Sequence, residues 1–435
     1  MSIWPKEPLG RHAEIRARIG WRGLSSAEYT TEGPFLIAGQ HIKNGRVDWD
    51  ACDHLSEERY QESSEIALRC GDVIISKDGT IGRVARIDAL SSQATLNGTM
   101  MLVRPRPSLE YRYLYHFLGG HTFQKLIEDK VSGSSIPHLF QRDMVSLTVD
   151  MPPLKEQSRI AAVLDTVDEA IAKTEAVIAK LKQVRIGLLH DLLTCGLDEH
   201  GQLRDPIAHP EQFQDSPLGR IPREWEIKAL NEIVASAVDG PFGSNLKTEH
   251  YVNEPGVRVV RLQNIESNWF DESDKAFVSE DHAFSLQRHQ VASGDLLVAS
   301  MGDENHPLAR ACLYPAHLPL GIVKADCFRL RMKPMMATNG FVMLLLNCPS
   351  TRRGLNVLGQ GVTRDRVNLT TLLTLRVLRP PVEEQRHIVK MIDALDLRMQ
   401  TEEALHSKLA FLKSGLMSDL LTGRVRVPEE ITVAS

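Results

Sequence analysis

The sequence contains an internal repeat: residues 152–194 match residues 380–422 without a gap, at a constant offset of 228. Of the 43 aligned positions 17 are identical, where ordinary amino-acid usage would give roughly 3 by chance. The identical pairs are Pro152/Pro380, Pro153/Pro381, Glu156/Glu384, Gln157/Gln385, Ile160/Ile388, Asp165/Asp393, Asp168/Asp396, Glu175/Glu403, Ala176/Ala404, Lys180/Lys408, Leu181/Leu409, Gly187/Gly415, Leu188/Leu416, Asp191/Asp419, Leu192/Leu420, Leu193/Leu421 and Thr194/Thr422. A repeat of this length predicts that the chain builds one structural unit twice.

The segments before these stretches repeat more loosely. At an offset of 223 the shared pairs are Gln40/Gln263, Ile42/Ile265, Ser56/Ser279, Glu57/Glu280, Gly71/Gly294 and Asp72/Asp295, and Gly133/Gly361 returns to 228. About five residues are therefore inserted in the second copy between positions 303 and 361. Each copy consists of a variable globular part followed by a near-identical helix, and two such copies imply a pseudo-two-fold molecule made from one chain.

Both matched stretches have the pattern of long helices. They lack proline after their first turn, contain a single glycine each and place apolar side chains at near-heptad spacing. Such a stripe needs a partner, and the other helix is the obvious one. We expect helix–helix contacts at Ile160, Leu164, Val167, Leu181, Leu188, Leu192, Ile388, Ile392, Leu395, Leu409, Leu416 and Leu420. The matched glycines Gly187 and Gly415 indicate either a close helix crossing or kink, or a tolerated glycine copied by duplication.

The length of 435 residues fits two domains and two long helices. We predict an α+β fold: two globular domains separated by two long antiparallel helices, with an internal pseudo-two-fold repeat. The predicted boundaries place the first globular domain at 1–151, the first helix at 152–197, a linker at 198–223, the second globular domain at 224–379, the second helix at 380–423 and a tail at 424–435.

Several elements of the globular parts can be predicted from their patterns. The apolar runs 73–76 and 81–87 flank Lys-Asp-Gly-Thr and predict a hairpin with an Asp-Gly turn. Further strands are expected at 100–103, 257–261, 296–300 and 328–332, and helices at 111–130 and 341–347. The linker shows no periodicity and is expected to be irregular.

The bulk properties indicate a cytoplasmic protein without membrane association. No apolar run reaches the ~20 residues that a membrane span needs, and the first residues do not resemble a signal peptide. The six cysteines are scattered, with no C-x-x-C pair, so we expect reduced thiols and no metal site.

Charge is distributed unevenly along the chain. The net charge of −5 argues mildly against nucleic-acid binding. However, residues 305–379 contain eleven Lys or Arg against two Asp, and residues 224–304 contain 15 acidic against 6 basic residues. In the first copy, residues 83–142 contain 8 basic and 4 acidic residues. A basic half of each globular part could face phosphates, although charge also varies along chains by chance.

The ends of the two helices carry motifs typical of one family. Each helix opens on Pro-Pro-x-x-Glu-Gln, at 152–157 and 380–385, and closes on Asp-Leu-Leu-Thr, at 191–194 and 419–422. Together with the segments 71–82, 213–226, 239–245 and 261–265, these motifs make nearly the whole chain resemble the specificity subunit of type I restriction-modification enzymes. The sequence departs from the pattern at 301–305, where Met-Gly-Asp-Glu-Asn replaces the Asp-Gly-Thr of the first hairpin.

The resemblance implies a role in DNA recognition. The two globular parts would be target recognition domains, each reading one half of a bipartite, asymmetric site in double-stranded DNA, and the helices would set the gap between the halves. Two methyltransferase (modification) subunits would dock on the helices, and two restriction/translocase subunits would join them. No cofactor is expected in this chain, whereas S-adenosylmethionine, ATP and Mg would belong to the partner subunits.

The sequence lacks the motifs that an enzyme of this kind would need. It contains no Asn-Pro-Pro-Tyr/Phe or Asp-Pro-Pro-Tyr of adenine methyltransferases, no G-x-x-x-x-G-K-[ST] phosphate loop and no H-E-x-x-H. We therefore expect a non-catalytic recognition subunit, with no catalytic residues. The alternatives are a coiled-coil scaffold that joins protein partners without reading DNA, and a fused single-chain enzyme.

DNA contacts require Arg, Lys, Asn, Gln, Ser or Thr on elements that reach base edges, or basic side chains beside phosphates. In the first domain the candidates are Gln40, His41, Lys77, Ser134, Ser135 and Arg142. In the second they are Gln263, Asn264, Ser300, Arg364 and Arg366. A shared structural role is the rival explanation for the matched Gln40 and Gln263, and a solvated turn lysine is the rival for Lys77.

Overall fold

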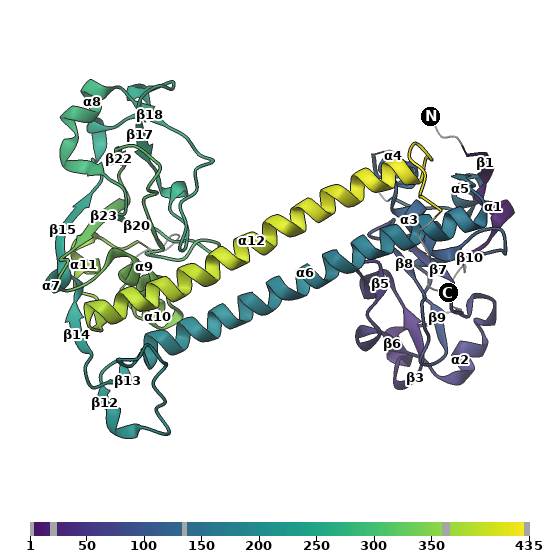
Figure 1. Cartoon of the computed structure of the whole chain (residues 1–435), viewed down its shortest axis with the longest axis horizontal. Coiled ribbons are helices and arrows are strands. Elements are labelled where there is room, and N and C mark those ends of the chain that lie inside the picture. Colours follow the sequence, from purple (N-terminus) through teal and green to yellow (C-terminus); the bar gives the residue numbers. More distant parts are fainter. Residues whose placement is uncertain (1–3, 18–23, 133–136, 359–365, 430–435) are drawn as a thin grey trace. The chain divides into compact units, whose positions relative to one another are not determined.

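The computed structural model describes residues 4–17, 24–132, 137–358 and 366–429 (Figure 1). The chain divides into two compact units: Met1–Ala179 with Thr401–Ser435, and Lys180–Gln400. Each unit therefore combines one globular part with a portion of both long helices.

The first unit is built on a four-stranded antiparallel sheet. Its strand order is β2 (Ala13–Arg16), β10 (Met100–Pro105), β7 (Val73–Ser76) and β8 (Val84–Arg86). Strands β7 and β8 confirm the predicted hairpin, with Val73 opposite Arg86. A second sheet pairs β3 (Thr30–Ile37) in parallel with β9 (Ala94–Leu96) and antiparallel with β6 (Asp53–His54).

The four-stranded sheet of the first unit is buried on both faces. Successive side chains of a strand point to opposite faces, and Val73 and Ile75 pack with helices α3 (Tyr111–Gly119) and α4 (His121–Ser132). Ile74, between them, packs instead with the β3–β9 side. The sheet therefore carries a separate hydrophobic core on each face. Each buried Leu or Ile in these cores contributes ~1.5–3 kcal/mol to the free energy of unfolding.

The second unit repeats the four-stranded sheet strand for strand and enlarges the other sheet. Its four-stranded sheet has the order β15 (Val234–Asp239), β23 (Cys327–Met332), β20 (Leu296–Ala299) and β21 (Ala311–Leu313). The parallel pair recurs as β17 (Val257–Val260) with β22 (Gly321–Val323). This pair belongs to a five-stranded sheet in the second unit. The other members of that sheet are β16 (Tyr251–Val252), β18 (Phe277–Val278) and β19 (Gln290–Val291).

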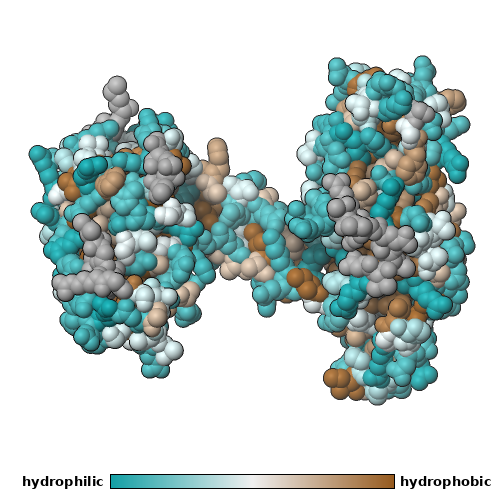
Figure 2. Space-filling model, turned by 180° about the vertical axis from the view of Figure 1, so that it is seen from behind, coloured by the Kyte–Doolittle hydropathy of each residue, from teal (hydrophilic) through white to brown (hydrophobic). Residues whose placement is uncertain are grey.

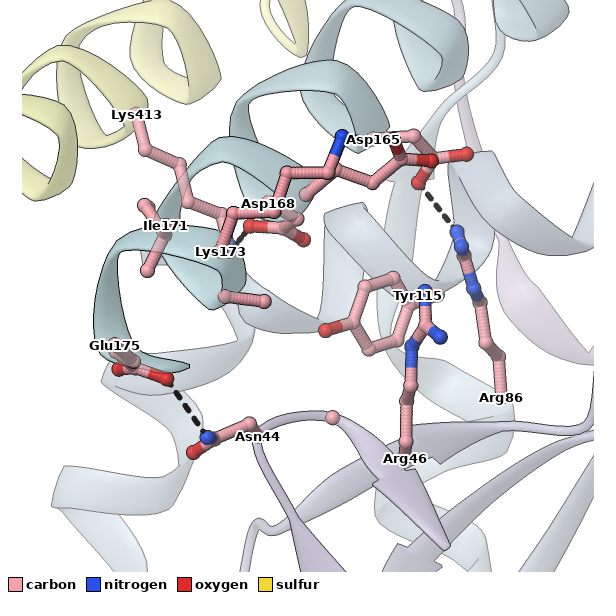
Figure 3. A pocket seen from close by; sticks show the side chains of 13 residues that line it. Asn44, Arg46, Arg86, Tyr115, Asp165, Asp168, Ile171, Lys173, Glu175 and Lys413 are labelled. Carbon is pink, nitrogen blue, oxygen red and sulfur yellow. Dashed lines mark hydrogen bonds and ion pairs between the residues drawn. The ribbon is translucent and has the colours of Figure 1, made fainter. Parts of the chain in front are cut away.

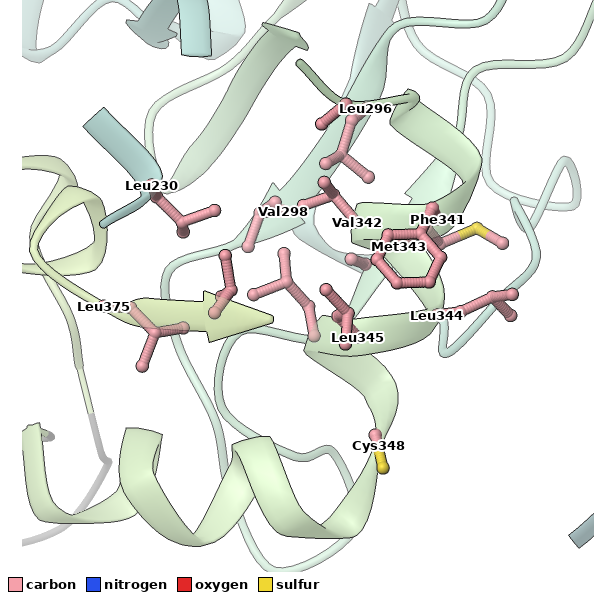
Figure 4. Packing of buried hydrophobic residues seen from close by; sticks show 14 of the residues in the cluster. Leu230, Leu296, Val298, Phe341, Val342, Met343, Leu344, Leu345, Cys348 and Leu375 are labelled. Atoms are coloured by element: carbon pink, nitrogen blue, oxygen red, sulfur yellow. The ribbon is translucent and has the colours of Figure 1, made fainter. Parts of the chain in front are cut away.

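A largely apolar helix covers the second sheet. Helix α9 (Asn339–Asn347) buries almost every side chain, and Phe341, Leu344 and Leu345 gather beside Leu296 and Val298 (Figure 4). It lies where the sequence predicted a helix at 341–347. Strands β1 (Lys6–Pro8) with β11 (Thr148–Asp150), and β14 (Glu226–Ala229) with β24 (Arg376–Arg379), close the two globular parts at matched places. The shorter helices are α1 (Leu9–His12), α2 (Glu57–Gln61), α5 (Gln141–Ser146), α7 (Leu230–Ile233), α8 (Glu280–Ser285), α10 (Pro349–Leu358) and α11 (Leu369–Leu373).

The two long helices are α6 (Leu154–Thr194) and α12 (Val382–Leu420), drawn in teal and yellow in Figure 1. In the first unit Lys413 Nζ lies 2.5 Å from Asp168 Oδ1, and His406 Nε2 lies 3.2 Å from Glu175 Oε1. In the second unit Arg185 Nε lies 2.5 Å from Asp396 Oδ1. The residue numbers of each pair add up to the same total, so the helices run antiparallel in both units. The repeat relates Asp168 to Asp396 and Lys413 to Arg185, which makes this one ion pair built twice.

The predicted helix–helix residues fall into two groups. Ile160, Leu164 and Leu420 share a core cluster in the first unit with half-buried Leu416 packed against it, and Leu192, Ile388 and Ile392 do so in the second unit with Leu188. The other four, Val167, Leu181, Leu395 and Leu409, are half-buried. The apolar stripe is thus most deeply buried where each helix also meets a globular part.

The structure decides one open alternative and differs from the sequence-based expectations in two places. A Cβ added at Gly187 or Gly415 would meet no atom within 4 Å outside the backbone of its own helix, which excludes a close crossing there and favours a tolerated glycine. The helix expected at 111–130 is broken into α3 and α4 at Gly120, where an added Cβ would lie 3.1 Å from the Phe117 carbonyl oxygen. The linker contains a hairpin of β12 (Phe213–Ser216) and β13 (Gly219–Pro222), which turns at Gly219 with φ +100°. The hairpin was not predicted because its strands are short and have no regular spacing of apolar residues.

Candidate nucleic-acid interface

The matched glutamates at the helix starts accept hydrogen bonds from the segments that leave the other helix. In the second unit Glu384 accepts from the backbone N–H of Leu197 at 2.7 Å, from Arg204 Nη1 at 2.7 Å and from Trp225 Nε1 at 3.1 Å. In the first unit Glu156 accepts from the backbone N–H of Val427 at 3.3 Å. The residues that follow each helix are therefore held by the start of its antiparallel partner.

The matched glutamines that follow have a second structural role. Gln157 Oε1 accepts from the backbone N–H of Glu110 at 2.8 Å, and its Nε2 donates to the Pro152 carbonyl at 2.9 Å. Gln385 makes the same bonds, with the N–H of Thr338 at 2.9 Å and the Pro380 carbonyl at 2.9 Å. The glutamine thus fixes each globular part to its own helix, while the glutamate holds the segment after the other helix, which explains why the dipeptide is repeated.

The first unit adds an ionic joint between its globular part and α6 (Figure 3). Asp165 accepts from Arg86 and lies 2.8 Å from His116 Nε2, and Arg112 Nη1 is 3.7 Å away. Burial alone would raise the pKa of Asp165, but hydrogen bonds and charge from His116 and Arg86 hold it below its usual value. A cavity of about 590 Å³ lies beside this cluster, and Lys413 and Glu175 also line it. Its charged groups pair with one another, so the cluster joins the domain to its helix.

Two of the predicted contact positions lie in matched 3₁₀ turns. Gln40 and Gln263 are exposed, in Gly39–His41 and Leu262–Asn264. Their neighbours His41 and Asn264 are buried, and each accepts from the backbone N–H three residues earlier, at 3.0 Å and 2.8 Å. Both buried side chains therefore shape the turn that presents the exposed glutamine.

Lys77 lies at the end of β7, where its ammonium pairs with Asp78 at 2.8 Å. The same carboxylate accepts from His138 Nδ1. Burial tends to raise the pKa of Asp78, but the hydrogen bonds from Lys77 and His138 lower it overall. The backbone fixes this arrangement, because Lys77 N–H donates to Thr99 O at 2.8 Å and Leu139 N–H donates to Lys77 O at 3.0 Å.

Ser300 occupies the corresponding place in the second unit and is 1% exposed. Its N–H donates to Asp326 O at 2.9 Å, and its carbonyl accepts from Val367 N–H at 2.9 Å. Arg366 lies 2.5 Å from Asp326 Oδ1 and 6.0 Å from the centre of the Phe242 ring. The predicted Ser300 and Arg366 are therefore brought together, one buried and one exposed.

The remaining predicted residues are placed as follows. Arg142 is exposed on α5, with its guanidinium 4.6 Å from the centre of the Phe140 ring. Ser134, Ser135 and Arg364 lie outside the described residues.

Much of the basic excess at 305–379 is internal. Arg310 is 3% exposed and donates to three backbone carbonyls, and Arg329 is 4% exposed. Arg331 forms a two-point ion pair with Asp295, as Arg104 does with Asp72 in the first unit. The surface charge available for phosphates is thus smaller than the count of basic residues indicates.

His138, Asp78 and Asp326 are not among the residues predicted from the sequence. The offset of 228 relates His138 to Arg366, so the repeat contained a signal for the histidine. Asp326 pairs with Arg366 across 40 residues, and no local pattern marks it.

The described part of the chain brings no three His, Cys, Asp or Glu side chains together in a metal-binding group. Within the same residues, no helix is both long and apolar enough to span a membrane. On the face drawn in Figure 2, hydrophilic residues predominate on both units, with hydrophobic residues scattered among them.

Comparison with known proteins agrees with the motifs and the fold. Residues 27–183 match the family model described as type I restriction modification DNA specificity domain. The type I restriction enzyme MjaVIII specificity subunit of Methanocaldococcus jannaschii is 23% identical over 376 residues, which cover 84% of this chain and 81% of that protein. The chain is thus similar to type I specificity subunits along most of its length, and its residues 27–183 match their DNA specificity domain.

Other specificity subunits are similar along most of the chain. The EcoKI specificity subunit of Escherichia coli K12 is 22% identical, with 86% of this chain and 78% of that protein covered. The crystal structure of a type I S subunit from M. genitalium superposes with a TM-score of 0.59 at 16% identity and covers 96% of both chains. This likeness shows that the two proteins share a fold.

Proposed function

We propose that this chain is the DNA sequence-specificity subunit of a type I restriction-modification complex, in which each globular domain reads one half of a bipartite, asymmetric site. The observation that carries the proposal is one fold built twice with different side chains at matched positions. Lys77 stands where the second domain has Ser300, and His138 where it has Arg366. Because base edges are distinguished by the donors and acceptors that face them, equivalent folds with different side chains read different sequences.

The two helices set the gap between the half-sites. The repeated ion pairs, Asp168 with Lys413 and Asp396 with Arg185, give α6 and α12 one antiparallel register. Half-site spacing in other two-fold DNA-binding proteins follows the spacing of their reading elements. A fixed register between α6 and α12 therefore supports a constant number of base pairs between the two half-sites.

Methyltransferase subunits dock on the helices, one for each copy of the repeat. The support is a set of exposed apolar side chains at matched positions. Val177 is 41% and Leu405 45% exposed, and Val184 is 41% and Leu412 49% exposed. Exposed apolar groups that recur by an internal repeat fit two copies of the same partner.

The catalytic work belongs to other subunits. This chain is a non-catalytic subunit, and two methyltransferase subunits with S-adenosylmethionine and two restriction/translocase subunits with ATP and Mg would complete a cytoplasmic complex. The missing catalytic motifs support this division.

Selection from a pool of random duplexes tests the proposal. The chain, co-expressed with its neighbouring methyltransferase subunit, should enrich DNA with two short unrelated motifs at one fixed separation. Enrichment of no motif by a stable complex would contradict the proposal and would favour a coiled-coil scaffold without sequence-specific binding.

A further inference from the structure

The two domains present a partly exposed nitrogen-bearing side chain at the same point of the same backbone frame. In the first domain the frame consists of the bonds from Lys77 N–H to Thr99 O and from Leu139 N–H to Lys77 O. In the second it consists of the bonds from Ser300 N–H to Asp326 O and from Val367 N–H to Ser300 O. His138 directly precedes the donor Leu139 in the first domain, and Arg366 directly precedes the donor Val367 in the second.

A carboxylate from a neighbouring loop pairs with each of these two side chains, His138 and Arg366. His138 Nδ1 bonds to Asp78, which follows β7, and the two side chains are 31% and 34% exposed. Arg366 Nη2 lies 2.5 Å from Asp326, which precedes β23, and these side chains are 50% and 28% exposed. The two domains thus share the backbone frame, but the carboxylate follows strand β7 in the first domain and precedes strand β23 in the second.

An aromatic ring lies beside each of these side chains. The ring centres of His138 and Phe140 are 4.3 Å apart, and the guanidinium of Arg366 lies 6.0 Å from the centre of the Phe242 ring. Phe140 is 42% and Phe242 50% exposed. A ring and a carboxylate together limit the directions in which the imidazole or guanidinium can point, which lowers the entropy lost on binding a partner.

A carboxylate beside a DNA-contacting side chain disfavours contact with a phosphate and favours contact with a base. Beside a phosphate it would repel the backbone and weaken the contact. Beside a base edge it fixes the orientation of a donor and can itself accept a hydrogen bond from an exocyclic amino group. The paired carboxylates Asp78 and Asp326 therefore favour base contact over phosphate contact.

We propose that His138 and Arg366 are the equivalent base-reading residues of the two domains, each oriented by its carboxylate, and that Arg366 donates to the O6 and N7 acceptors of a guanine. This inference rests on the proposed function and assigns a specificity residue to each half-site. Arg366 is thereby a base contact, where its basic surroundings alone would suggest a phosphate contact.

The test compares Arg366→Ala, Arg366→Lys and His138→Ala in the complex with the methyltransferase subunit, with base preference measured at every position of the selected DNA. Arg366→Ala should lower the preference at one position of one half-site roughly 5- to 150-fold. Arg366→Lys keeps the charge but loses the planar fork, so it should lose most of the same preference. His138→Ala should alter the other half-site alone.

Arg376→Ala is the matched control, because it removes an exposed arginine from the same domain. It should leave the sequence preference unchanged. If Arg366→Ala weakened binding to all sequences equally and lowered the salt slope by about one, Arg366 would be a phosphate contact and the assignment would be wrong. Absence of any base preference in the wild-type complex would overturn the proposed function itself, whereas unchanged preferences in folded variants would overturn only the assignment.

Discussion

Glu384 and Glu156 occupy matched positions, and their partners decide how much each stabilises the fold. The Arg204 side chain that pairs with Glu384 is 7% exposed, whereas Glu156 pairs with Arg159, one turn along the same helix and 15% exposed, and with Arg426, which is 59% exposed. Glu384→Ala leaves a buried guanidinium without its carboxylate, so it should lower the free energy of unfolding by about 3 kcal/mol or more. Glu156→Ala should lower it by only about 1–2 kcal/mol.

Denaturant unfolding of the two variants, followed by far-ultraviolet circular dichroism, measures both losses. The loss in the free energy of unfolding should be larger for Glu384→Ala than for Glu156→Ala. A larger loss for Glu156→Ala would mean that burial of the arginine partner does not control the contribution of these glutamates.

Titration of Asp239 should make the free energy of unfolding depend on pH. One of its carboxyl oxygens has no hydrogen-bond partner among the described residues, and burial, with repulsion from Asp326, raises its pKa to about 6. The folded state therefore binds this proton more tightly than the unfolded chain, whose aspartate pKa is about 3.9. The stabilisation is complete below about pH 4 and is lost as the pH rises through about 6.

Asp239→Asn should consequently be more stable than the wild type above about pH 6, by roughly 1 kcal/mol once solvent screening is allowed for. The gain should shrink to nothing near pH 4. Thermal unfolding of both proteins across this range provides the measurement. An equal gain at both ends of the range would show that titration of Asp239 is not its cause.

At the residue scale the repeat reveals more than single residues do. The exposed Gln40 and Gln263 could be predicted as candidates because they are matched, but burial of the adjacent His41 and Asn264 depends on which backbone groups each turn leaves unpaired. The buried roles of Arg310 and Arg329 were equally hidden, because a sequence shows charge but not whether carbonyl oxygens surround it. Pairing of His138 with Asp78 needs residues 60 apart in the chain.

At the element scale the two helix glycines allow a direct test of helix surfaces. Gly187 and Gly415 are exposed, and an added methyl group would meet no atom within 4 Å. Glycine is less favourable than alanine in a helix interior by ~1 kcal/mol. Gly187→Ala and Gly415→Ala should therefore each raise the free energy of unfolding by about 0.5–1 kcal/mol, as urea titrations can determine. Destabilisation by either change would mean that the glycine has a close neighbour after all.

The elements themselves were largely predictable, and the exceptions have local causes. Heptad spacing and the absence of proline identify α6 and α12, whose observed bounds are Leu154–Thr194 and Val382–Leu420. Short continuous apolar runs identify β7 and β20, which are buried at every position. The break between α3 and α4 and the hairpin of β12 and β13 follow from backbone geometry at Gly120 and Gly219, which periodicity does not report.

At the scale of the whole molecule, helix length should determine the separation of the recognised half-sites. Deletion of residues 179–182 together with 407–410 removes about one turn from each helix at positions related by the repeat, preserves the antiparallel register and leaves the four exposed docking residues in place. Four residues span ~6 Å of helix, and a base pair rises ~3.4 Å. The selected gap should shorten by roughly one to two base pairs, with both half-sites unchanged. Deletion in one helix alone breaks the register and provides the control. An unchanged gap in the folded double deletion would refute the idea that the helices act as a ruler.

The central claim is that one chain carries two different DNA-reading domains held at a fixed separation. The most direct measurement is the pattern of methylated adenines in an unmethylated host that expresses this chain with its neighbouring methyltransferase subunit, read by single-molecule sequencing. We predict one asymmetric motif: two short, unrelated half-sites around a gap of constant length. A palindromic motif or a single uninterrupted one would contradict the claim, as would a stable complex that leaves the genome unmodified.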